Sequence, residues 1–197
     1  MCLSPRDEAA QLTYGSAVGG HEPVDWDELK CLTLIGSHIG EDTRNTVMQD
    51  FANAQARGAK VIVVDPRFSS VAAKADYWLP IKPGTDTALL LAWINVLITE
   101  GLYDKDFVQR CCSGFDRSQM PPSREDEESY TDYILGTRDG QPKTPEWAEA
   151  ITAVPRDVIA RIAREYATAK AAVLYQGYGM QRRAYGEQVV RAGCTLA

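Results

Sequence analysis

Hydrophobic residues along the chain fall into short continuous runs and longer stretches with helical periodicity. Short apolar runs that end in turn residues are typical of buried strands. The predicted strands are Cys31 to Ile35, Lys60 to Val64, a short extended segment within ADYWLPIKPG (75–84), and AAVLYQ (171–176).

Stretches with helical spacing separate these runs and carry start and stop signals. The first predicted helix begins near Thr43 and ends at Gly58, and the second runs from Thr85 or Asp86 as N-cap to Gly101. A third helix follows Asp104, and a fourth starts at Thr144-Pro145. The last two cover residues 155–170 and the C-terminal stretch. Strands that alternate with helices indicate βαβ units and a mostly parallel sheet, so the predicted fold class is α/β.

Residues 113–143 interrupt this alternation. Pro121-Pro122 and the acidic run Glu125 to Glu128 predict an exposed excursion whose charges are solvated. We interpret residues 1–30 as a lead-in and residues 31–197 as one domain. The last helix reaches the end of the sequence without a stop signal, so we expect a truncated helix and a piece of a longer protein.

Composition narrows the possible partners and sites. Of 197 residues, 45% are hydrophobic, and the net charge is -6 with acids and bases interspersed. The absence of a basic stripe argues against nucleic acid. The longest apolar stretch, Ala88 to Ile98, is too short for a membrane span. The cysteines form no CxxC pair, which argues against a zinc site or a disulfide framework. They are Cys2, Cys31, Cys111, Cys112 and Cys194.

Ligands of open parallel sheets bind beyond the carboxyl ends of the strands, so the strand exits are the candidate site. After the first strand, Gly36 permits close backbone approach, and Ser37, His38 and Thr43 offer donors before a helix N-terminus. Such a turn suits a phosphate. It matches neither GxGxxG nor a P-loop, so an ordinary strand-to-helix turn stays an equal alternative.

The second strand ends in Asp65-Pro66-Arg67. Dinucleotide-binding folds place a carboxylate against ribose hydroxyls at this topological position. Arg67 could hold a phosphate or stack on a base. The alternative is that Asp65 caps a short following helix and Arg67 pairs with a surface acid.

The third exit contains Gly84, Thr85 and Asp86. A carboxylate at Asp86 could accept two hydrogen bonds from guanine and exclude adenine, or it could be a plain N-cap. After the last strand, Gly179, Gln181 and Arg182 lie in GYGMQRR, where the adjacent arginines could hold an anion or be merely exposed.

No arrangement of a nucleophile with a base, no carboxylate pair and no metal-ligand cluster stands out in the sequence. His38 is the one acid-base side chain near the exits, and a lone histidine does not support a catalytic role. The residues by themselves therefore predict a nucleotide-binding α/β domain without a catalytic centre.

Several motifs together resemble the molybdopterin oxidoreductases of the dimethyl sulfoxide reductase family, including catalytic chains that reduce dimethyl sulfoxide, polysulfide or thiosulfate. The resemblance covers almost the whole chain from Cys31. The motifs are VIVVDPR, KADYWLPIKPGTDTALLLAWINVLI, EGLYDKDFV, KTPEWAEAITAVP and GYGMQRRAYGEQVVRA, in that order.

This resemblance implies a Rossmann-like three-layer domain that holds part of a molybdenum bis(molybdopterin guanine dinucleotide) cofactor. The first turn, which reads Ser-His-Ile instead of the family's common asparagine-proline, would meet the pyrophosphate or pterin. Asp65 and Arg67 would meet the guanosine, and Asp86 the guanine edge. Gly179, Gln181 and Arg182 would lie near the pterin or phosphates.

For the parent protein, the resemblance implies removal of an oxygen or sulfur atom from a small S-oxide or sulfur compound in anaerobic respiration. It also implies an iron-sulfur cluster outside this chain, an iron-sulfur electron-transfer subunit, and a membrane anchor subunit at the outer face of the bacterial cytoplasmic membrane. The molybdenum ligand is not in the sequence, so we expect this chain alone to be inactive. A stand-alone nucleotide-binding regulatory module and a purely structural domain remain the alternatives.

Overall fold

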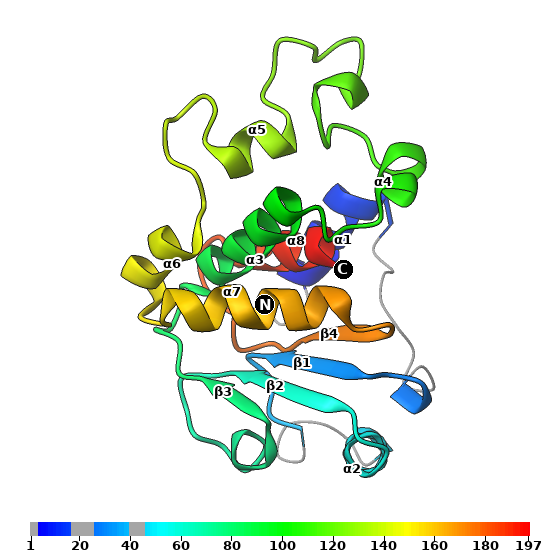
Figure 1. The fold of residues 1–197 in the computed structure, drawn as a ribbon, viewed down its shortest axis with the longest axis vertical. Helices are drawn as coiled ribbons and strands as arrows, with labels where there is room; N and C mark the ends of the chain where they lie inside the picture. The colour runs from blue at the N-terminus through cyan, green and yellow to red at the C-terminus, as the bar shows by residue number, and fades with distance from the viewer. Residues whose placement is uncertain (1–3, 17–25, 40–45) are drawn as a thin grey trace.

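A parallel four-stranded sheet in the order β3-β2-β1-β4 forms the centre of the protein (Figure 1). The computed structural model describes residues 4–16, 26–39 and 46–197. Every neighbouring pair of strands is parallel, which confirms the predicted α/β class. The strands are β1 (Cys31–Ile35), β2 (Lys60–Val64), β3 (Tyr77–Leu79) and β4 (Ala172–Gln176).

Helices cover both faces of the sheet, which gives three layers (Figure 1). One face is covered by α2 (Thr46–Ala56). The helices on the other side are α1 (Ser4–Tyr14), α3 (Asp86–Glu100), α6 (Pro145–Thr152), α7 (Arg156–Thr168) and α8 (Gly186–Leu196). Beyond α3, farther from the sheet, lie α4 (Lys105–Cys111) and α5 (Tyr130–Leu135).

Side chains of the two central strands alternate between two cores, as the period of two in a strand requires. Leu32 and Leu34 join the core beneath α2, whereas Cys31 and Ile35 join the core beneath α3, α7 and α8. Burial on both faces explains why these strands appear in the sequence as continuous apolar runs rather than alternating ones.

Helix α3 is the hydrophobic centre of the larger core. Its residues Leu89, Leu90 and Trp93 are fully buried, and each such side chain contributes about 1.5–3 kcal/mol of burial free energy. The helix ends at Gly101, which is left-handed with φ 67° and bonds back to the Leu97 and Ile98 carbonyls. The apolar pattern and the terminal glycine both predicted this element.

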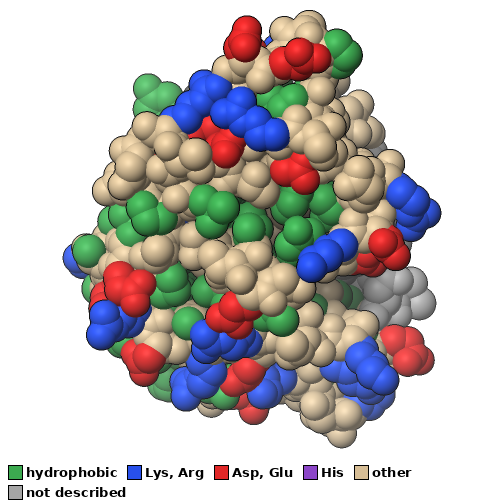
Figure 2. Space-filling view, turned by 45° about the horizontal axis from the view of Figure 1, so that its top comes forward, with side chains coloured by type: hydrophobic (Ala, Val, Ile, Leu, Met, Phe, Trp, Pro, Cys, Tyr) green, Lys and Arg blue, Asp and Glu red, His purple; other side chains and the backbone are tan. Residues whose placement is uncertain are grey.

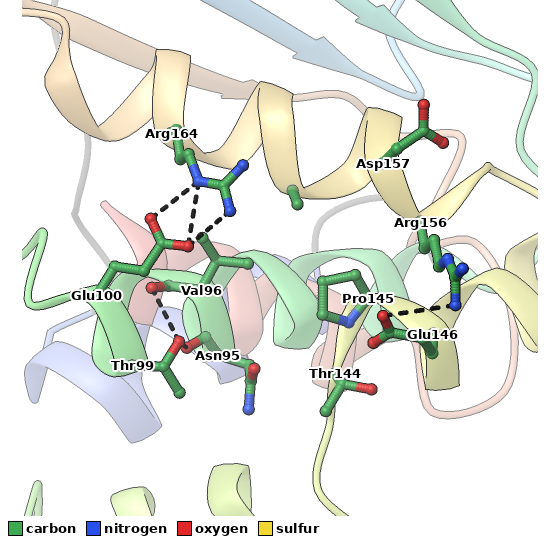
Figure 3. Close-up of a pocket in the computed structure, with 11 residues that line it drawn as sticks. Asn95, Val96, Thr99, Glu100, Thr144, Pro145, Glu146, Arg156, Asp157 and Arg164 are labelled. Carbon is green, nitrogen blue, oxygen red and sulfur yellow. Dashed lines mark hydrogen bonds and ion pairs between the residues drawn. The ribbon is translucent and has the colours of Figure 1, made fainter.

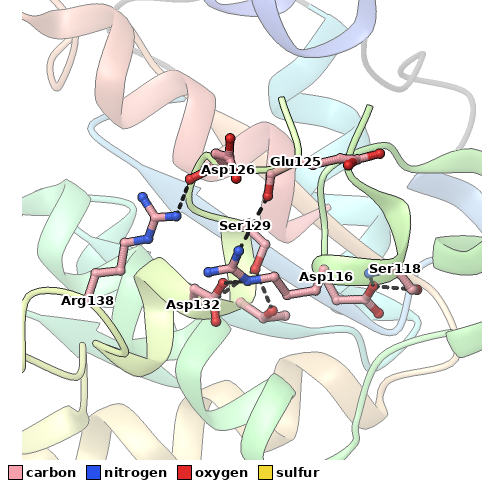
Figure 4. Close-up of polar contacts among 9 residues, drawn as sticks. Asp116, Ser118, Glu125, Asp126, Ser129, Asp132 and Arg138 are labelled. Carbon is pink, nitrogen blue, oxygen red and sulfur yellow. Dashed lines mark hydrogen bonds and ion pairs between the residues drawn. The ribbon is translucent and has the colours of Figure 1, made fainter. Parts of the chain in front are cut away.

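The excursion at 113–143 contains the helix α5, which sequence patterns did not predict. Ile134 buries completely, and Asn95 of α3 donates a hydrogen bond to its carbonyl at 3.4 Å. Arg117 pairs with Asp132 at 2.8 Å, within the polar network drawn in Figure 4. One buried apolar side chain and polar contacts therefore hold the 113–143 segment against the rest of the domain, because the segment has little hydrophobic core of its own.

On the face shown in Figure 2, basic and acidic side chains are interspersed around hydrophobic ones. Among the described residues, no helix is both long enough and apolar enough to cross a membrane.

Candidate functional site

The carboxyl ends of β1 and β4 lie side by side at the point where the strand order of the sheet reverses. From β1 the chain adds β2 and β3 on one side, and β4 pairs with β1 on the other. Ligands of open α/β sheets bind at such a switch point. The backbone N–H of Gly177 donates to Ile35 O at 2.8 Å, and that of Gly179 donates to Gly36 O at 3.1 Å.

Glycines make this close approach possible. A Cβ at Gly177 would lie 2.2 Å from Gly36 O, and one at Gly179 would lie 2.9 Å from the same atom. Gly36 also has φ +56°, and its Cβ would meet Met180 N at 2.9 Å. Any side chain would therefore push the two exits apart, as expected where backbones or ligands approach closely.

The donors predicted after β1 lie in the described part of the chain except Thr43, which is outside it. Ser37 and His38 are buried. His38 Nε2 and Ser70 Oγ are 2.9 Å apart, so this side chain connects the first exit to the loop that follows β2.

Asp65 ends β2 as a buried acid. Its Oδ1 accepts a hydrogen bond from Arg67 N at 2.7 Å, and its carbonyl accepts one from Trp78 Nε1 at 2.8 Å. The next helical turn is Ala72–Lys74, with Val71 at its N-cap, so Asp65 does not cap a helix. Pro66 and Arg67 are exposed at the strand end.

Asp86 is the first residue of α3 and is 5% exposed. Thr85 holds the N-cap position but forms no side-chain cap bond; its hydroxyl donates to Lys82 O at 2.7 Å. Burial raises the pKa of Asp86, and the nearby Asp65 charge adds to this rise, while a hydrogen bond from its own backbone N–H and the Arg183 charge lower the pKa. A buried carboxylate with a perturbed pKa at a strand exit has the properties of a binding group.

The segment after β4 brings two arginines to this edge. Arg182 lies over the Tyr178 ring at 5.1 Å from its centroid, and the preceding Gln181 is fully buried. Arg183 extends towards Gly84: a Cβ there would be 2.8 Å from its Nη1. Sequence reasoning noted Arg183 only as a neighbour of Arg182, although the Gln-Arg-Arg motif held the signal.

Arg6 of α1 is a second residue that the sequence did not point to. Its guanidinium lies 4.9 Å from the Tyr178 centroid and donates to the Gln176 carbonyl. Tyr178 thus contacts two arginines. Because 170 residues separate Arg6 from Gln176, no local pattern could have revealed this contact.

A cavity of about 660 Å³ lies elsewhere, between α3, α6 and α7 (Figure 3). Its charges are largely paired: Arg164 with Glu100 at 2.7 Å and Arg156 with Glu146 at 3.8 Å. None of the predicted site residues lines it. The strand exits, which carry glycines and buried acids, therefore remain the candidate site.

Within the described ranges, no cluster of His, Cys, Asp and Glu could hold a metal ion. The four cysteines described, Cys31, Cys111, Cys112 and Cys194, are free thiols.

Comparison with known proteins identifies the family. The model of the molybdopterin oxidoreductases matches residues 3–197. The chain belongs to the molybdopterin oxidoreductase family. It is 40% identical over 195 residues to dimethyl sulfoxide reductase DmsA of Escherichia coli, covering 96% of this chain and 24% of that protein. Thiosulfate reductase subunit PhsA of Salmonella typhimurium is 37% identical, over 76% of this chain and 17% of that protein.

The fold agrees with this membership. Acetylene hydratase from Pelobacter acetylenicus superimposes with a TM-score of 0.76 and 29% identity, covering 99% of this chain and 24% of that one. The chain thus spans a quarter or less of the length of these relatives. Molybdopterin oxidoreductases use a molybdenum-pterin cofactor, and the glycine-lined exits and buried carboxylates fit the phosphate and ring edges of such a group.

Proposed function

We propose that this chain holds the guanosine end of a molybdopterin guanine dinucleotide in a molybdenum-dependent reductase. The observation that carries the proposal is the position of Asp86, a buried acid at the carboxyl edge of the sheet, whose pKa is affected by both Asp65 and Arg183 from neighbouring exits. Three segments that are distant in sequence therefore converge around one carboxylate.

Each group has a role that its chemistry suits. Asp86 would accept the N1–H and N2 amine of guanine, a pairing that adenine does not offer. Asp65 would orient the ribose, and Arg67 would meet the guanosine or a phosphate. Gly36 and Gly179 would let the cofactor's phosphates and pterin approach the backbone. When bound, the molybdenum cofactor supplies two-electron atom transfer, and these residues bind and orient it.

The names of the relatives support a proposal about the reaction of the whole protein. They include reductases of dimethyl sulfoxide, trimethylamine N-oxide and thiosulfate. We infer for the whole protein the removal of an oxygen or sulfur atom from a small acceptor. Electrons would arrive through an iron-sulfur cluster and an iron-sulfur subunit, with a membrane anchor at the outer face of the cytoplasmic membrane.

Nucleotide binding tests the assignment directly. We expect GDP to raise the melting temperature of the protein, IDP to raise it less because it lacks the N2 amine, and ADP to leave it unchanged. Ligand at a hundredfold excess over Kd stabilises by about 2.7 kcal/mol. Asp86→Asn should weaken GDP binding by roughly 1.5–3 kcal/mol, the range for a hydrogen bond to a charged group.

Asp157→Asn is the matched control, because Asp157 is also in the first turn of a helix but is exposed. It should bind GDP like the wild type. A response to ATP or NAD alone would favour a stand-alone nucleotide-binding regulatory module instead. No response to any nucleotide, with Asp86→Asn behaving like Asp157→Asn, would favour a purely structural role for these exits.

A further inference from the structure

Two arginines from distant parts of the chain meet at Tyr178, which follows β4. The guanidinium carbon of Arg6 lies 4.9 Å from the centroid of the Tyr178 ring, and that of Arg182 lies 5.1 Å from the same point. Arg6 also donates a hydrogen bond to the carbonyl of Gln176, the last residue of β4. Helix α1 therefore brings a cation of its own to the carboxyl edge of the sheet.

The packing of α1 fixes the position of Arg6. Ala9 and Ala10 of this helix are buried, and such small side chains let it lie close to α8 (Figure 1). At the far end of α1, Tyr14 donates its hydroxyl hydrogen to Cys194 O of α8 at 3.0 Å. Because the helix is held at both ends, the Arg6 guanidinium stays beside the end of β4.

The positive charges at Tyr178 are not cancelled by an acid bound to Arg6. Within residues 4–16, 26–39 and 46–197, no carboxylate forms an ion pair with Arg6. Each guanidinium carbon lies about 5 Å from one ring centroid, so the two are at most about 10 Å apart, no more than the Debye length at 0.1 M salt. The ring attracts both cations, but an anion between them would relieve their repulsion.

Charges along the carboxyl edge follow the strand order β3-β2-β1-β4. The buried acids lie on one side, because Asp65 follows β2 and Asp86 begins the helix after β3. Arg6 and Arg182 lie on the other side, at β4. A nucleotide has an uncharged base at one end and anionic phosphates at the other, so it matches this edge with its phosphates towards β4.

We propose that Arg6 and Arg182 together bind the diphosphate of the nucleotide, with Tyr178 as the ring that keeps the two guanidiniums close to each other. Guanidinium groups suit this ligand, because their paired N–H donors match phosphate oxygens. The inference deepens the function proposed above and rests on it for the identity of the ligand. It makes α1 a part of the binding site, and not only a helix that covers α8.

Calorimetric titration with inorganic pyrophosphate, GDP and ADP tests the inference. We expect Arg6→Gln to weaken the binding of pyrophosphate and of GDP by about five- to tenfold, because charge-assisted hydrogen bonds are lost. The ratio of GDP to ADP affinity should stay unchanged, since the base determines it. Arg182→Gln should cause a similar loss, and it leaves the bond between Arg6 and Gln176 in place if Arg6→Gln does not fold.

Arg191→Gln is the matched control, because Arg191 is an exposed arginine of α8 that bonds to Gln188. It should bind pyrophosphate like the wild type. Unchanged pyrophosphate binding by either folded variant, Arg6→Gln or Arg182→Gln, would overturn the inference, as would a wild type that does not bind pyrophosphate.

The same titrations separate this inference from the proposed function. If the wild type binds GDP and ADP equally, recognition of guanine fails, whereas the loss of pyrophosphate binding in the arginine variants is still measurable. If the wild type prefers GDP but pyrophosphate binding does not depend on the two arginines, only the diphosphate site fails.

Discussion

The two edges of the sheet use charge in opposite ways. At the amino edge, Lys60 Nζ lies 2.5 Å from Glu165 Oε2, and Tyr77 donates its hydroxyl hydrogen to Glu165 Oε1 at 3.0 Å. At the carboxyl edge, Asp65 and Asp86 are both buried, and the Asp65 charge disfavours the charged form of Asp86.

The pKa values of one carboxyl group at each edge reflect this difference. Burial alone would raise the pKa of Glu165, but hydrogen bonds from Lys60 and Tyr77 outweigh it and hold that pKa below its ordinary value. For Asp86, burial prevails and the pKa is raised. The amino edge is therefore arranged for stability, whereas the carboxyl edge keeps an incompletely compensated acid, as binding sites commonly do.

Backbone packing gives the largest expected contrast between the edges. Gly177→Ala places a Cβ 2.2 Å from Gly36 O. Because a backbone atom cannot rotate away, we expect the free energy of unfolding to fall by about 3 kcal/mol or more. Gly58, just before β2 at the amino edge, has φ +83°, and a Cβ at this position would have nothing within 4 Å. Gly58→Ala should cost only about 1–2 kcal/mol of left-handed strain.

Chemical denaturation of the two alanine variants measures both losses. A loss for Gly177→Ala no larger than that for Gly58→Ala would mean that the exits of β1 and β4 can move apart easily, and the expected contrast between the two edges would be wrong.

Local signals explain what could be predicted from the sequence. Strands at Cys31–Ile35 and Lys60–Val64 have the predicted bounds, because apolar runs and turn residues are properties of neighbouring positions. The Thr144 cap with Pro145 is confirmed for the same reason, since Thr144 accepts a hydrogen bond from Trp147 N.

The candidate site was only partly predictable, because contacts between its walls join distant parts of the chain. Topology alone indicated that Gly36, Asp65 and Asp86 would share one edge. The reach of Arg183 to Gly84 and the position of Arg6 over Tyr178 depend on how α8 and α1 pack. A single sequence carries no local pattern for such packing. Cofactor binding by the predicted residues stays a prediction.

The next largest loss of stability is expected when the contacts of Glu165 with Lys60 and Tyr77 are weakened. Glu165→Gln removes the charge that faces Lys60, so we expect a loss of about 1 kcal/mol at pH 7. A carboxyl with a lowered folded-state pKa stabilises above its unfolded value, here 4.5, and loses that contribution as the pH falls. The difference between wild type and variant should therefore shrink in acid.

Thermal unfolding between pH 3 and 7 measures this dependence. Glu100→Gln is the control, because the Glu100 pair with Arg164 is about half exposed and should contribute at most about 0.5 kcal/mol. A loss for Glu165→Gln that persists unchanged at pH 3 would point to packing rather than charge.

Asp86→Asn should give the smallest effect, and one of opposite sign. The raised pKa of Asp86 means that its ionised form is less stable in the folded protein than in the unfolded chain. The penalty is absent below the ordinary value of 3.8, grows as the pH rises towards the folded-state pKa, and is complete above it. We therefore expect Asp86→Asn to raise the melting temperature by about one or two degrees at pH 7 and to leave it unchanged at pH 3. A lower melting temperature at pH 7 would mean that the ionised carboxylate stabilises the fold, and the contrast between the two edges would then disappear.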